Sequence, residues 1–173
     1  MENQLEVWQR GPVPGVAPLL QPVAHALLQV GEEVDRIMKD FPDKLLWGKP
    51  AGVASPAFHL QHIRGVVDRL FTYARKEQLN EQQMHALLLE GKPEQSALSV
   101  KELIAQLDLQ ISQAIQELMN VKEDTLTEAR GVGRKQIPVT LIGLYVHVAE
   151  HSMRHIGQLL VTVKILNDAN QAI

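Results

Sequence analysis

Apolar side chains recur at three- and four-residue steps in four long segments of this chain, and this periodicity constrains its fold more than any other feature. Residues three and four apart lie on the same face of an α-helix, so each segment predicts an amphipathic helix with one buried side. No window alternates apolar and polar residues at a period of two, and we therefore expect no appreciable sheet. The stripe residues predicted to be buried include Leu27, Val34, Ile63, Val66, Leu107, Ile111 and Leu144.

Two of these segments begin with clear helix-start signals. Ser55 and Pro56 place an N-cap serine before a first-turn proline, and Ser99 and Glu102 have the spacing of a capping box. We predict an all-α four-helix bundle, with a short extra helix between the second and third helices. The four helices are expected over residues 22–39, 56–76, 100–121 and 138–167, the short helix over 81–90 and a polar loop over 122–137.

The length of the chain suits a single domain. Its 173 residues are enough to bury a core of ordinary size. Neither an internal repeat nor a linker divides the sequence, and residues 1–17 form an irregular lead-in that contains prolines and glycines. One helical-bundle domain is therefore expected to span residues 1–173.

Charge and cysteine content exclude several function classes. The net charge is −3 without a long run of Lys or Arg, which disfavours nucleic-acid binding because that affinity depends on neutralising phosphates. The lack of cysteine excludes disulfides, Cys–zinc sites and iron–sulfur clusters, and it fits a reducing cytoplasm. The first residues lack the pattern of a signal peptide, and no run of about 18 apolar residues is present to span a membrane. We expect a cytoplasmic protein with neither nucleic acid nor membrane as partner.

Three of the seven histidines lie at four-residue intervals, at positions His147, His151 and His155. Residues four apart on a helix have Cβ atoms roughly 5–6 Å apart. Two such imidazoles can bind one metal ion through bonds of about 2.0–2.1 Å. We predict that His151 and His155 are two ligands of a metal ion, with a third from another helix. The alternative is that these histidines are hydrogen-bonded structural side chains.

His62 is a candidate third ligand. It lies early in the second predicted helix, and it reaches the level of His151 and His155 if that helix runs antiparallel to the last one. Helices in contact lie about 8–10 Å apart, which allows the three rings to meet. A three-histidine site with an open position is typical of catalytic zinc, and imidazole equally suits nickel or iron. His25 and His85 are expected at the surface.

Other metal and haem motifs are weaker here. His147, Glu150 and His151 satisfy the H-x-x-E-H pattern of inverzincin metalloproteases, but the larger protease framework is missing. A di-iron bundle needs Glu-x-x-His on two helices, a spacing that this chain lacks. Covalent haem attachment needs cysteine.

Two stretches together resemble the DinB-like (YfiT-like) metalloenzyme superfamily: Ser55 to His62, and His151-x-x-x-His155-x-Gly157-Gln158. The resemblance covers residues 20–167 and implies a four-helix bundle of that family's kind. It also implies metal ligands at His62, His151 and His155.

The resemblance has implications for several neighbouring residues as well. His59 and His147 fall outside the ligand pattern, as residues that support the ligands or as alternative ligands. Gly157 would let a neighbouring helix approach. Ile156 stands where many members carry Arg, which puts any role of that Arg in doubt here.

Members of that superfamily with known activity transfer low-molecular-weight thiols such as bacillithiol, or are thiol-dependent isomerases. The resemblance therefore implies a metal-dependent enzyme that transfers a small thiol to an electrophilic small molecule. A metal-dependent hydrolase and a noncatalytic metal-binding bundle are the alternatives. We expect one divalent ion, zinc or nickel with iron or manganese as alternatives, and a small thiol as cosubstrate. A small-molecule substrate is the expected partner, and a homodimer is an open option.

Residues around the predicted site have less specific roles, and no catalytic residue is assigned beyond the ligands. Arg130, Arg134 and Lys135 are candidates for receiving an anionic thiol, with a solvated loop as the alternative. Glu150 points away from His151 on the helix and is expected to form an ion pair. Tyr145 is expected to pack in the core and Arg154 to lie at the surface.

Overall fold

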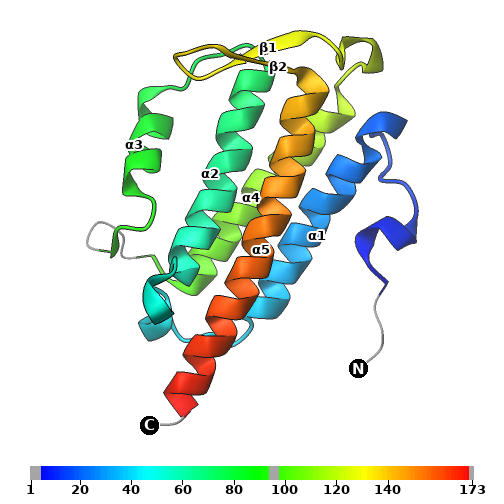
Figure 1. Cartoon of the computed structure of the whole chain (residues 1–173). Coiled ribbons are helices and arrows are strands. Elements are labelled where there is room, and N and C mark those ends of the chain that lie inside the picture. The colour runs from blue at the N-terminus through cyan, green and yellow to red at the C-terminus, as the bar shows by residue number, and fades with distance from the viewer. Residues whose placement is uncertain (1–4, 94–97, 172–173) are drawn as a thin grey trace.

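Four long helices make up the bundle in the computed structural model of the chain, which describes residues 5–93 and 98–171. Their bounds are α1 (Gln21–Met38), α2 (Pro56–Ala74), α4 (Val100–Met119) and α5 (Leu141–Gln171). The short helix α3 (Glu81–Leu89) lies alongside α2 (Figure 1). Two short 3₁₀ turns precede α1, η1 (Val7–Arg10) and η2 (Pro18–Leu20), and others lie in the connections between the long helices: η3 (Asp43–Leu45), η4 (Pro50–Gly52) and η6 (Glu123–Thr125). The predicted helical bundle with a short extra helix is confirmed.

The helices are not arranged as a simple up-and-down bundle. In Figure 1, α1 and α5 run in one direction while α2 and α4 run in the other. Helix α5 packs against α1 and α2, and α4 packs against the same two helices. Helices α1 and α2 therefore occupy diagonal corners although they follow each other in the chain. Helices α2 and α5 are antiparallel neighbours, which is the arrangement that the predicted site requires.

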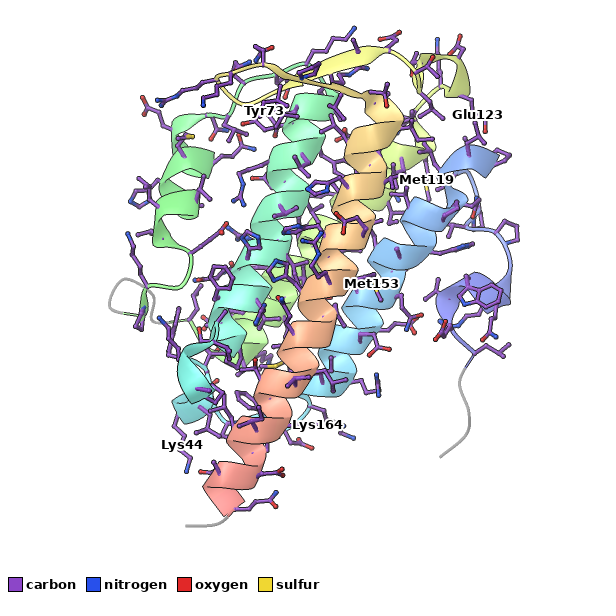
Figure 2. The ribbon with its side chains drawn as sticks, in the orientation of Figure 1. Lys44, Tyr73, Met119, Glu123, Met153 and Lys164 are labelled. Carbon is purple, nitrogen blue, oxygen red and sulfur yellow. The ribbon has the colours of Figure 1, made fainter. Side chains whose placement is uncertain are left out.

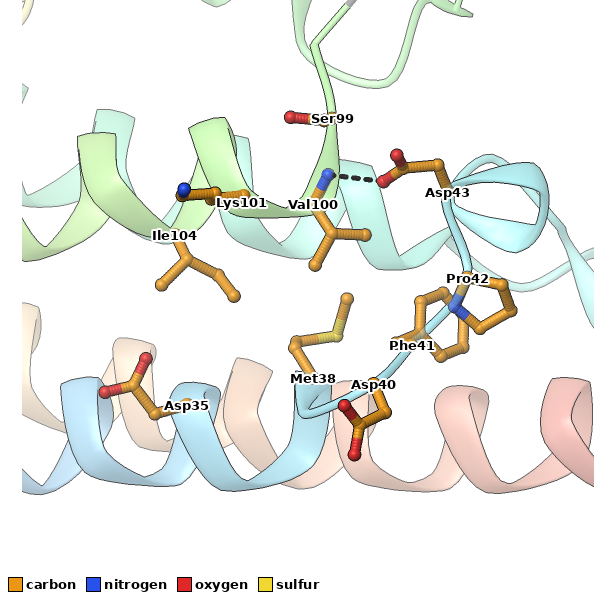
Figure 3. A pocket seen from close by; sticks show the side chains of 10 residues that line it. All are labelled: Asp35, Met38, Asp40, Phe41, Pro42, Asp43, Ser99, Val100, Lys101 and Ile104. Atoms are coloured by element: carbon orange, nitrogen blue, oxygen red, sulfur yellow. Dashed lines mark hydrogen bonds between the residues drawn. The ribbon is translucent and has the colours of Figure 1, made fainter.

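Local capping interactions fix where the helices begin. The Ser55 hydroxyl accepts a hydrogen bond from the Phe58 amide of α2 at 3.3 Å. Ser99 and Glu102 form the predicted capping box of α4. The Asp43 carboxylate adds to it by accepting from the Val100 amide at 2.8 Å, in a hollow between the end of α1 and the start of α4 (Figure 3). An acidic group at this position is favourable because the helix dipole is positive at its N-terminus.

The segment before α5 was predicted as a loop and the first turn of a helix, and this is wrong. The strands β1 (Ala129–Val132) and β2 (Ile137–Thr140) form an antiparallel hairpin. Pro138 lies in β2 rather than in the first helical turn.

Helix α5 begins at Leu141 because Thr140 and the segment just before the hairpin provide its first acceptors. The Leu141 amide donates to the Glu128 carbonyl at 3.0 Å, and the Ile142 amide donates to the Leu126 carbonyl at 2.9 Å. The Thr140 hydroxyl accepts from the Gly143 amide at 3.1 Å. Thr140 therefore satisfies the amide that an N-cap side chain normally satisfies.

The core lies between the four long helices. Every side chain in the predicted core set is buried: Leu27, Val34, Ile63, Val66, Leu107, Ile111 and Leu144. Tyr145 is buried as predicted, and its ring centroid lies 5.0 Å from that of Phe71. Within the described residues, no helix has the length and apolar content needed to cross a membrane.

Candidate metal centre

Helices α2 and α5 bring His62, His151 and His155 together. Each of these rings offers one nitrogen, and the three nitrogens lie within 4.8 Å of one another. The ring centroids of His62 and His155 are 4.6 Å apart, and those of His151 and His155 are 4.7 Å apart. Met153, labelled in Figure 2, marks the level of this cluster along α5, since His151 and His155 lie on either side of it in the sequence. The structure thus groups His151 and His155, which the spacing suggested, with His62, which was the candidate third ligand from another helix.

The spacing of the ring nitrogens is close to that of a metal-binding site. His62 Nε2 and His151 Nε2 lie 3.0 Å apart. Two nitrogen ligands at tetrahedral angles and bonds of 2.0–2.1 Å would lie about 3.3 Å apart. The residues present therefore fit a divalent ion after small side-chain adjustments.

Two rings of the cluster favour the neutral form, which is the form that binds a metal ion. Burial, followed by the charge of His62, lowers the pKa of His155 to about 4. Burial also lowers the pKa of His151, with further contributions from His62 and His147. Both imidazoles therefore keep a free lone pair near pH 7.

Glu90 is a member of this site that sequence reasoning missed. Its carboxylate accepts from His62 Nδ1 at 2.6 Å and from Arg69 Nη1 at 2.6 Å. Burial acts to raise the pKa of Glu90, but the hydrogen bonds from His62 and Arg69 outweigh it and lower that pKa. No signal in the sequence pointed to Glu90, because its contact with His62 arises only when the turn after α3 brings Glu90 back to α2.

His59 supports the cluster from the buried side. Its ring is only 1% exposed, and its Nδ1 lies 3.0 Å from His155 Nδ1. Burial, followed by the charge of His62, lowers the pKa of His59 to about 4. His59 Nε2 is buried without a hydrogen-bond partner among the described residues. His59 is thus a neighbour of the candidate ligand His155. The sequence left two roles open for His59, support of a ligand or service as an alternative ligand, and this contact fits the first.

A second group of candidate ligands, His147, Glu150 and His151, lies toward the outer face of α5. His147 and Glu150 are exposed; Glu150 Oε1 lies 2.7 Å from His147 Nδ1, and Glu150 forms an ion pair with Arg154 at 2.6 Å. These contacts confirm the predicted ion pair of Glu150 and the predicted surface position of Arg154. His151 Nε2 is directed to His62, so the cluster between the helices is the better candidate.

The structure contradicts the suggested role of Arg130. Its side chain is buried, and its Nε donates to the Ala74 carbonyl at 2.6 Å, at the C-terminal end of α2. Ala74 lies about three turns beyond His62, which is roughly 18 Å along the helix axis. Arg134 and Lys135 are exposed in the turn of the same hairpin. A thiol at the histidine cluster is therefore out of reach of Arg130.

Other sequence expectations have mixed outcomes. Gly157 was expected to let a neighbouring helix approach, but an added Cβ would meet nothing within 4 Å among the described residues. Ile156 is buried in the core. His85 is exposed as predicted, whereas His25 is half-buried, with its Nε2 3.1 Å from the Gly11 carbonyl.

Comparisons with known proteins agree with this architecture. The sequence model of the DinB superfamily matches residues 26–159 of the chain. A crystal structure of a protein from Streptococcus pneumoniae is similar, with a TM-score of 0.60 at 14% sequence identity, and the match covers 84% of this chain and 88% of that chain. At this level of identity the likeness shows a common fold. No curated protein matches the chain.

Proposed function

Because this chain belongs to the DinB superfamily, we propose that it is a metal-dependent enzyme in which His62, His151 and His155 hold one divalent ion. The observation that carries this proposal is the convergence of three imidazoles from α2 and α5, with ring nitrogens within 4.8 Å of one another. Three histidine ligands leave a position open for a substrate, as in catalytic zinc sites. Zinc and nickel suit this ligand set, and iron and manganese are the alternatives.

The proposed reaction is the transfer of a small thiol to an electrophilic small molecule. A divalent ion lowers the pKa of a thiol or a water molecule bound to it. In the transfer a carbon–sulfur bond forms, the bond from that carbon to its leaving group breaks, and the thiol proton passes to solvent. The chain has no cysteine, so the thiol must come from solution.

Side chains around the cluster hold it in place and shield it. Phe58 stacks on the His62 ring, with centroids 5.0 Å apart and planes 12° from parallel. His59 lies against His155 on the buried side. These contacts restrict the rings of His62 and His155, and Phe58 gives the site an apolar wall. An apolar wall suits a small substrate with an apolar part.

Turnover assays distinguish thiol transfer from the hydrolase alternative. The metal-loaded protein is incubated with several cellular thiols and a chromogenic alkylating substrate. Loss of free thiol should exceed that with metal alone, should stop with chelator and should be lost in His151→Ala, while His85→Ala retains it. If no thiol gives metal-dependent turnover and a panel of hydrolase substrates does, with the same sensitivity to His151→Ala, the transferase proposal is wrong and hydrolysis replaces it.

A further inference from the structure

We propose that Glu90 is a positioning residue of the metal centre, which fixes His62 in the tautomer whose Nε2 can bind the ion. The inference rests on the proposed metal site and assigns one more residue to it. Glu90 does not lie among the three converging imidazoles; it acts through His62.

The contact between Glu90 and His62 determines where the proton of the ring lies. Glu90 Oε2 lies 2.6 Å from His62 Nδ1, and a carboxylate only accepts hydrogen bonds. In the neutral ring the proton is therefore on Nδ1, and the lone pair is on Nε2. That Nε2 lies 3.0 Å from His151 Nε2, so the lone pair belongs to the nitrogen that faces the cluster.

Glu90 is itself held in place by Arg69. Arg69 Nη1 lies 2.6 Å from Glu90 Oε1, and the side chains of both residues are almost fully buried. Gly65 leaves the space for this pair, because a Cβ at that position would overlap both Arg69 Nη1 and Glu90 Oε1. A glycine inside a helix is otherwise unfavourable, and here it makes room for the ion pair behind His62.

The turn that carries Glu90 is attached to α2 by neighbouring contacts as well. The Gly91 amide donates to Gln61 Oε1 at 2.9 Å. Gly91 has φ of +76°, and a Cβ there would lie 3.1 Å from Phe58 Cδ2. The backbone beside Glu90 is thus fixed on the same turn of α2 that carries His62, so the carboxylate stays opposite Nδ1.

Replacing Glu90 with Gln tests this role with little change in size. A glutamine has one acceptor oxygen and one NH₂ group. Arg69 can only donate, so the amide oxygen is drawn to Arg69 and the NH₂ group faces His62 Nδ1. Nδ1 must then accept, which moves the ring proton to Nε2 and removes the lone pair from the metal side.

Two measurements on Glu90→Gln test the inference. Nitrogen-15 NMR of the imidazoles in the metal-free protein reports the tautomer of His62, and competition with a chromogenic chelator reports the affinity for Zn²⁺. We expect the wild type to carry the proton on Nδ1, and Glu90→Gln to shift it to Nε2 and weaken zinc binding about 10–100-fold. Glu81→Gln, an exposed substitution on α3, is the matched control and should change neither quantity.

The outcomes separate this inference from the proposed function. An unchanged tautomer in Glu90→Gln, with zinc affinity within twofold of the wild type, overturns the positioning role while the metal site stands. Weaker zinc binding without a change of tautomer also overturns it, because a merely structural role would give that result. A wild type with the proton on Nδ1 that binds no metal would contradict the proposed function instead.

Gly65→Ala provides a second test if Glu90→Gln does not fold. The added methyl group should displace the Arg69–Glu90 pair and so reduce zinc affinity by a similar factor. Gly31→Ala in α1 is its matched control, because an added Cβ there would make ordinary contacts at 3.5 and 3.6 Å. If Gly65→Ala binds zinc as tightly as the control Gly31→Ala, the inference is overturned.

Discussion

His62 on α2 and His151 on α5 face each other through their Nε2 atoms at 3.0 Å, although they are 89 residues apart in the chain. The bundle makes this contact possible because α2 and α5 are antiparallel neighbours (Figure 1). His155 lies one turn further along α5, within the same group. The candidate site therefore depends on the packing of one pair of helices.

The metal-free protein should lose stability as the pH falls from about 6.5 toward 4. The pKa values of His59 and His155 are lowered to about 4 in the folded chain, from an ordinary value of 6.5. Between these values the unfolded chain binds protons that the folded chain does not, so the free energy of unfolding decreases with falling pH. Thermal unfolding across this range measures the effect. His59→Gln should reduce the slope and His85→Gln should not; an equal slope in all three proteins would contradict the assignment.

Truncation of Leu107 should be much more costly than truncation of Leu109 on the same helix. Leu107 is fully buried, whereas Leu109 is 60% exposed. Replacing a buried leucine with alanine removes apolar burial and leaves a cavity, at a cost of about 2–5 kcal/mol. Chemical denaturation measures both variants. Similar losses at the two positions would mean that the buried face of α4 is wrongly assigned.

Arg130→Ala should weaken the fold rather than thiol binding. The guanidinium donates to the Ala74 carbonyl at 2.6 Å in a buried position. Losing that hydrogen bond leaves the carbonyl unsatisfied, which costs about 1–3 kcal/mol. The free energy of unfolding and the KM for thiol are the two measurements, with Arg134→Ala as the exposed control. A raised KM in an Arg130 variant of unchanged stability would restore the anion-binding role.

Gly157→Ala should be tolerated and should raise stability by up to about 1 kcal/mol, because alanine is the better helix former. An added Cβ at this position meets nothing within 4 Å among the described residues. Denaturant unfolding of this variant gives the change directly. A clear loss of stability would show that a neighbouring surface covers Gly157 in the folded protein.

The parts of the fold that were predictable from the sequence depend on local signals. Ser55 and Ser99 cap α2 and α4 as predicted, because an N-cap side chain bonds an amide only a few residues away. Pro138 misled the prediction for α5. The proline lies in β2, and the cap comes from Thr140 together with carbonyls of the preceding segment. Such a hairpin is stabilised by its contacts with the bundle rather than by its own sequence pattern.

The candidate site shows the same difference between residues with local sequence signals and residues placed by tertiary packing. His151 and His155 were predictable because a four-residue spacing places them on one helix face. Glu90 was not, since its contact with His62 depends on how the turn after α3 returns to α2. The interhelical contact of His59 with His155 has the same dependence on tertiary packing.

Elemental analysis of the purified protein, followed by anomalous diffraction at the metal absorption edge, tests the metal centre most directly. The wild type should contain one divalent ion per chain, with the anomalous peak between His62, His151 and His155. The double variant His151→Ala/His155→Ala should lose most of the metal, and His85→Ala should retain it. Stoichiometric metal in the double variant, or a peak away from these three rings, would contradict the site.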